Sequence, residues 1–167
     1  MSKIVSGYDG KKSNVVLLKG APERVLDKCT KVMQENGQER PMSDAQRNTL
    51  KEKVDKIGGQ GFRMIAVAIG LDGGNMKQVT VDNAKQQLAD SSQYQQLEGG
   101  NAFLGYVCIK DPVRPEVTDA IAECKTAGIN VIMITGDAKV TAVSIAKQLK
   151  IISQDTGENC FTGQEFE

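Results

Sequence analysis

The residues best suited to chemistry follow an apolar stretch, in VIMITGDAKVTA at positions 131–142. Thr135, Gly136 and Asp137 come where a buried strand should end and a helix should begin. Ligands of open parallel sheets bind at such strand ends, and a hydroxyl, a glycine N–H and a helix N-terminus suit a phosphate. Asp137 would then need a cation or a hydrogen-bond donor beside it. The simpler alternative, which spacing favours by about two to one, is that Asp137 only caps the helix.

Two basic residues lie in or beside other apolar segments. Lys19 ends one such segment and Arg63 begins another, and Gly20 and Pro22 then end the first strand and start a helix. A lone lysine there usually reaches for water from an edge strand. Two basic residues in one small sheet modestly raise the chance of a pair that faces a phosphate, since lysine supplies a point charge and arginine a fork of donors.

The elements that must position these residues follow from the hydrophobic pattern. Ser43 and Gln46 have the spacing of a capping box, and Gly128 is a helix stop. Residues 71–100 are expected to form a surface insertion with at most one short helix near 81–88. Strands are predicted at 14–19, 62–70, 101–110 and 130–135, and helices at 22–33, 43–58, 117–127 and 138–149.

A boundary is expected at the sequence DPVRP, residues 111–115. Its two prolines stiffen the chain, so Asp111 and Arg114 form either a hinge with an ion pair or part of the polar crevice, and sequence favours the hinge. The sequence before it alternates less regularly, whereas helix, strand and helix follow it as in a parallel sheet. The predicted fold class is α/β, with an α+β portion over 1–110 and a partial parallel βα unit over 111–167.

Composition excludes several classes of function. The 21 basic and 21 acidic residues give no net charge, and tryptophan is absent, which argues against nucleic-acid binding. The four cysteines are far apart and there is no histidine, so no metal site is expected. No apolar run is long enough to span a bilayer and no signal peptide is visible, so the chain itself is expected to be soluble.

Three motifs in order resemble the cytoplasmic region of a P-type ATPase, a cation pump that forms an aspartyl-phosphate. These are KGAPE at 19–23, DPVR at 111–114 and TGD at 135–137. The surrounding sequence is most similar to calcium pumps of the sarco/endoplasmic reticulum type, although KGAPERVLDKC also resembles sodium/potassium pumps. The resemblance implies that 1–110 is the later part of the nucleotide-binding domain and 111–167 the start of the second part of the haloacid-dehalogenase-like phosphorylation domain.

The resemblance also implies roles, cofactors and partners. The parent would use ATP and Mg²⁺, would lie in the endoplasmic reticulum membrane with this segment facing the cytosol, and would supply the remaining pump segments as partners. Exposed strand edges would allow a dimer. The implied roles are nucleotide binding for Lys19, Gly20 and Arg63, phosphate binding for Thr135, Gly136 and Asp137, and a place near the hinge and crevice for Asp111 and Arg114.

Missing motifs limit what this chain is expected to do. The sequence contains no DKTGT and therefore no phosphorylatable aspartate, and it lacks the family's TGDGxND and TGE segments. Phosphoryl transfer needs an in-line nucleophile and bridging cations, so the parent is expected to be an enzyme and this chain inactive, without a catalytic residue. Two alternatives are a receiver- or flavodoxin-type binding module and an interaction domain without a ligand. Neither explains three family motifs in order.

Overall fold

The computed structural model describes residues 1–6, 14–80 and 82–166 and divides into two compact units. One unit comprises Met1–Glu52 and Met64–Val107, and the other comprises Lys53–Arg63 and Cys108–Glu167. The domain boundary expected at residues 111–115 stays a prediction. Within the described ranges, no helix is long and apolar enough to cross a membrane.

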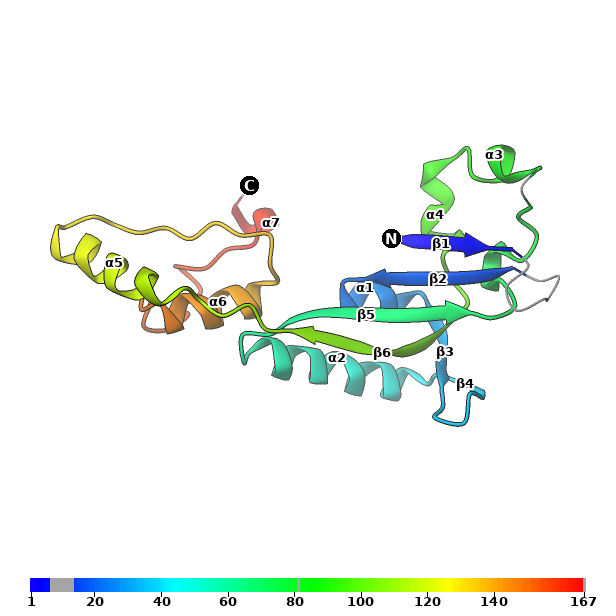
Figure 1. Ribbon diagram of the computed structural model, residues 1–167, viewed down its shortest axis with the longest axis horizontal. Coiled ribbons are helices and arrows are strands. Elements are labelled where there is room, and N and C mark those ends of the chain that lie inside the picture. Colours follow the sequence, from blue (N-terminus) through cyan, green and yellow to red (C-terminus); the bar gives the residue numbers. More distant parts are fainter. Residues whose placement is uncertain (7–13, 81, 167) are drawn as a thin grey trace. The chain divides into compact units, whose positions relative to one another are not determined.

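The described residues form a six-stranded sheet in the order β1-β2-β5-β6-β3-β4 (Figure 1). β1 pairs antiparallel with β2, β2 with β5, and β3 with β4, whereas β3 and β6 are parallel. The mixed α/β class is therefore confirmed, and so are the strands predicted at 14–19, 62–70 and 101–110. The strands are β1 (Ser2–Val5), β2 (Val15–Gly20), β3 (Cys29–Met33), β4 (Glu39–Pro41), β5 (Arg63–Gly70) and β6 (Asn101–Ile109).

The second predicted helix is confirmed as α2 (Asp44–Gly58). Its start is the expected capping box: Gln46 N donates to Ser43 Oγ at 3.2 Å, and Ser43 N donates to Gln46 Oε1 at 3.0 Å. Two backbone donors that lack helical partners are satisfied in this way.

The helix predicted over 22–33 is wrong in its second half. α1 (Pro22–Asp27) ends at the Lys28 cap, and the next residues form β3. Cys29, Val32 and Met33 have helical spacing, but the same segment pairs in parallel with β6, with Cys29 opposite Asn101. Pairing with a distant strand thus overrides a local hydrophobic pattern that is compatible with both a helix and a strand.

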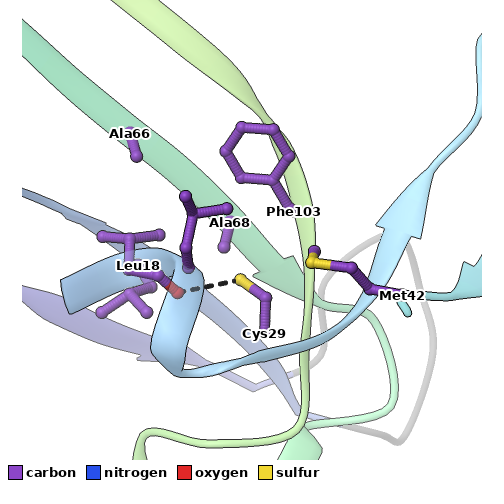
Figure 2. Packing of buried hydrophobic residues seen from close by; sticks show 8 residues of the cluster. Leu18, Cys29, Met42, Ala66, Ala68 and Phe103 are labelled. Carbon is purple, nitrogen blue, oxygen red and sulfur yellow. Dashed lines mark hydrogen bonds between the residues drawn. The ribbon is translucent and has the colours of Figure 1, made fainter. Parts of the chain in front are cut away.

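The main core lies between one face of the sheet and α1 (Figure 2), and Leu50 of α2 packs against it. Cys29 lies fully buried in it, and its Sγ donates to the Val25 carbonyl at 3.1 Å. Burial raises the pKa of this thiol to about 12, despite the charge of Arg47 nearby. The buried members are Leu18, Val25, Leu26, Cys29, Met42, Ala66, Ala68 and Phe103, with Leu50 packed against them.

The insertion at 71–100 is more ordered than predicted. It contains two 3₁₀ turns, Gly74–Met76 and Ser91–Gln93, and the short helices α3 (Ala84–Gln87) and α4 (Tyr94–Leu97). The expected helix at 81–88 is thus shorter, and Val81 lies outside the described residues. Met76 and Val79 are buried against Val16, so the insertion builds a second small core and does not only cover the surface.

The second unit contains the helices predicted at 117–127 and 138–149. α5 (Pro115–Thr126) ends before Gly128, whose φ of 75° confirms the predicted stop. α6 (Lys139–Gln148) and an unpredicted short helix, α7 (Gly163–Phe166), follow. The strand predicted at 130–135 is wrong, because that segment pairs with no described strand. A strand needs a neighbour for its backbone groups, and local sequence cannot supply one.

Candidate functional site

One face of the β2–β5 pair is partly exposed. Side chains alternate along a strand, so Val16 and Leu18 point into the core while Leu17 and Lys19 point the other way. Leu17 is directly opposite Ile69, and 42% of Leu17 is exposed. The exposed face therefore carries an apolar strip.

Lys19 lies at the end of this strip, directly opposite Val67. Its backbone is fixed, since Lys19 N donates to the Met1 carbonyl at 3.0 Å. Among the residues that the structure describes, no carboxylate pairs with its exposed amine. An apolar strip with an unpaired ammonium at one end suits a ligand that has a flat, mostly apolar ring and an anionic group.

The local packing does not require glycine at position 20. A Cβ atom built there would meet only the Val25 Cγ2, at an ordinary 3.6 Å, and the φ of Gly20 is not in the left-handed region. Gly20 lies at the end of β2, opposite Ala66. The fold would therefore accept alanine at this position.

The second unit brings Arg63 and Asp137 together, which sequence reasoning did not anticipate. Arg63 Nε lies 2.7 Å from Asp137 Oδ1, with 54% of the Arg63 side chain and 18% of the Asp137 side chain exposed. Thr141 on α6 donates to the Phe62 carbonyl at 3.3 Å. These two contacts attach the start of β5 to the N-terminal end of α6.

Asp137 does not cap α6, so the simpler interpretation of that residue is wrong. The N-cap of α6 is Ala138, which provides no side-chain cap. Asp137 N instead donates to Thr135 Oγ1 at 3.1 Å, which folds TGD into a tight turn. A Cβ at Gly136 would meet nothing within 4 Å, so the backbone of this turn is open on that side.

Asp111 and Arg114 lie in an exposed extended segment between β6 and α5. Arg114 is the N-cap of α5 and Pro115 is its first residue. The described residues show no ion pair between Asp111 and Arg114. The structure therefore does not bring these two together, and their hinge role stays a prediction.

Sequence reasoning missed the apolar strip on the exposed face of the β2–β5 pair. Leu17, Val67 and Ile69 are neighbours there through the β2–β5 register. The signal that could have identified them is the alternation of both strands, but the register, which strand sequences alone leave open, is needed to set them side by side. In the part of the chain that the structure describes, no three acidic or cysteine side chains group as metal ligands.

Comparison with known proteins identifies a family. The family described as P-type ATPase, cytoplasmic domain N, matches residues 1–116. A probable calcium-transporting ATPase of Trypanosoma brucei brucei is 35% identical over 169 residues, which cover 100% of this chain and 16% of that protein.

Further relatives differ in the ion they are named for. Calcium-transporting ATPase 4, endoplasmic reticulum-type, of Arabidopsis thaliana is 33% identical over 99% of this chain and 16% of that protein. The sodium/potassium-transporting ATPase subunit alpha of Hydra vulgaris is 36% identical over 93% of this chain and 14% of that protein. The chain thus spans about a sixth of the length of these pumps.

Proposed function

The chain belongs to the P-type ATPases through their cytoplasmic domain N, and from this premise we propose that the exposed β2–β5 face binds the nucleotide of an ATP-driven cation pump. The observation that carries the proposal is Lys19, an exposed and unpaired amine among the described residues, at the end of an apolar strip. The purine ring of the nucleotide would lie over Leu17, Val67 and Ile69, with Lys19 along the edge of the ring or near the phosphates.

Gly20 supports the same location. Because nothing in the local packing requires glycine, its missing side chain is best explained by an approaching ligand. A methyl group at this position would leave the fold intact but would reduce the space beside Lys19. Gly20→Ala therefore separates a binding role from a structural one.

For Arg63 we propose a contact with the nucleotide phosphates, and for Thr135, Gly136 and Asp137 the phosphate-binding role that the family resemblance implies. Arg63 is held by Asp137, so an arriving phosphate would have to replace or share that carboxylate. An arginine fork can do this, since its several donors bind carboxylate and phosphate alike. A phosphate held at the TGD turn would need Mg²⁺ to offset its charge next to Asp137.

For the longer parent protein we propose an endoplasmic reticulum calcium pump that works through an aspartyl-phosphate. Four calcium-transporting relatives match 93% to 100% of this chain, and the sodium/potassium relative, which matches 93%, is the second candidate. In this reading the chain faces the cytosol and works with the remaining pump segments. Without a phosphorylatable aspartate it should release no phosphate from ATP above background, and release that Asp137→Ala abolishes would contradict this.

The test is ATP affinity, measured by isothermal titration calorimetry on the whole chain and three variants. Lys19→Ala should weaken binding about tenfold or more, because a charge-assisted contact is lost. Gly20→Ala should also weaken binding while the melting temperature stays equal or rises. Lys53→Ala, which removes an exposed lysine on α2, is the matched control and should bind as the unaltered chain does. Equal affinity in all four proteins, or no binding at millimolar ATP, would overturn the proposal.

A further inference from the structure

The turn between β3 and β4 contains the only Asn-Gly pair of the sequence, Asn36-Gly37. Both residues are exposed, and a Cβ atom built at Gly37 would meet nothing within 4 Å. Because glycine has no side chain, nothing hinders the approach of its backbone nitrogen to a neighbouring group. The side-chain amide of an asparagine before glycine can therefore be lost when that nitrogen attacks the asparagine Cγ.

Backbone hydrogen bonds fix the shape of this turn. Gln34 N donates to the Gln38 carbonyl at 2.9 Å, and Gly37 N donates to the Gln34 carbonyl at 2.9 Å. The φ of Gly37 is 77°, in the left-handed region that glycine adopts without strain. The turn thus keeps the Asn36 side chain beside the Gly37 peptide while both residues are open to water.

The Asn36 side chain is folded back over the peptide that follows it. Gln38 N donates to Asn36 Oδ1 at 3.0 Å, which forms an Asx turn. This donor lies where negative charge would develop on the oxygen if Cγ were attacked, and it would stabilise that charge. Asn36 Nδ2 donates to Gln38 Oε1 at 3.3 Å, so the nitrogen that would leave also has a partner.

We propose that Asn36 is a site of spontaneous deamidation in the folded chain. Gly37 N leaves the Gln34 carbonyl, loses its proton to water or hydroxide, and forms a bond to Asn36 Cγ. The Cγ–Nδ2 bond breaks, and the nitrogen takes a proton from water and departs as ammonia. Water then opens the resulting cyclic imide at either of its carbonyls, which leaves aspartate or isoaspartate at position 36. No electrons are exchanged, and water is the co-reactant.

The products change the charge and the geometry of the turn. Either product adds a carboxylate beside Glu35 and close in sequence to Glu39. Isoaspartate also adds a carbon atom to the main chain, which would displace Gly37 N from the Gln34 carbonyl. In the described sheet β4 lies at the edge and pairs with β3 alone, so we expect this edge to loosen as the chain ages.

The test is residue-resolved mass spectrometry of the whole chain after incubation at neutral and mildly alkaline pH. We expect Asn36 to lose its amide in the native chain, and faster at alkaline pH, because Gly37 N must lose a proton. Asn48, which is exposed on α2 and followed by threonine, is the internal control and should stay intact. Gly37→Ala should slow the loss about tenfold or more, because a methyl group hinders the attack. Circular dichroism checks that this variant folds.

Several outcomes would overturn the proposal. If Asn36 stays intact in the native chain but loses its amide in urea, the turn protects it. Equal loss at Asn36 and Asn48, or a rate that Gly37→Ala leaves unchanged, would also contradict the mechanism. Aspartate without isoaspartate would mean direct hydrolysis of the amide and no attack by Gly37 N. If Gly37→Ala does not fold, the comparison of Asn36 with Asn48 and the identity of the products in the unaltered chain decide.

Discussion

Two helices of the second unit end in the same hydrogen-bond pattern with different residues at the turn. At the end of α5, Ile129 N donates to Cys124 O and Gly128 N to Lys125 O. At the end of α6, Ile151 N donates to Ala146 O and Lys150 N to Lys147 O. Both are Schellman motifs, which place one residue in the left-handed region. That residue has φ of 75° at Gly128 and 57° at Lys150.

Lys150→Gly should therefore stabilise the chain. A side chain in the left-handed region costs about 1 kcal/mol or more, and glycine avoids this cost although it also loosens the unfolded chain. The backbone carbonyl of residue 150, which accepts from Lys125 Nζ, is kept. We expect the free energy of unfolding in urea to rise by about 0.5–1 kcal/mol. Gly128→Ala is the matched reverse change and should lower it by a similar amount. A fall in stability for Lys150→Gly would contradict the account.

At the scale of elements, Glu98 joins segments that are distant in sequence. It follows α4, accepts from Ser2 Oγ on β1 at 2.6 Å and pairs with Lys28 at the end of α1. Its side chain is only 19% exposed. Desolvation raises the pKa of this carboxyl, but the hydrogen bonds from Lys28 and Ser2 outweigh it, and the net pKa is lowered.

A lowered folded pKa means that Glu98 stabilises the fold above its unfolded pKa and loses this effect as the pH falls through the folded value. Thermal melts should show Glu98→Gln less stable than the unaltered chain at pH 7, with the gap closing at acidic pH, below an ordinary carboxyl pKa of about 4.5. Exposed Glu35→Gln serves as control and should show no such gap. A gap of equal size at neutral and acidic pH would argue against this role.

The sequence correctly predicted the elements whose signals are local. The predictions were wrong where pairing between distant segments determines the structure. The capping box at Ser43 marks the start of α2, and Gly128 the end of α5, because both act within a few residues. The secondary-structure predictions for residues 29–33 and 130–135 were wrong in opposite directions. The first became a strand because β6 lies beside it, and the second did not because no described strand does.

The candidate site was predictable to a similar extent. Lys19 and Gly20 were identified as site residues from one motif, and both lie at the end of β2 by the open face. Predicting the apolar strip requires the β2–β5 register. The ion pair of Arg63 with Asp137 joins residues that are far apart in sequence. Neither could be obtained from local pattern, since each depends on how distant segments fold together.

At the scale of the whole molecule, the proposed nucleotide-binding face and the proposed phosphate-binding turn belong to different compact units. The face with Lys19 belongs to the first unit, and the TGD turn with its ion pair belongs to the second. We propose that this chain, which spans about a sixth of its relatives' length, carries the nucleotide-binding face, and that the phosphorylated residue lies in another part of the parent protein. The family match over residues 1–116 covers the whole of the proposed face.

The most direct test of the central claim is an amide-resolved NMR titration of the chain with ATP, with and without Mg²⁺. We expect chemical-shift changes centred on Leu17, Lys19, Gly20, Val67 and Ile69, and their loss in Lys19→Ala. The buried side of the same strands, at Val16 and Ala68, should respond less. Absence of any change at millimolar ATP, or changes that persist in Lys19→Ala and centre on another surface, would contradict the claim.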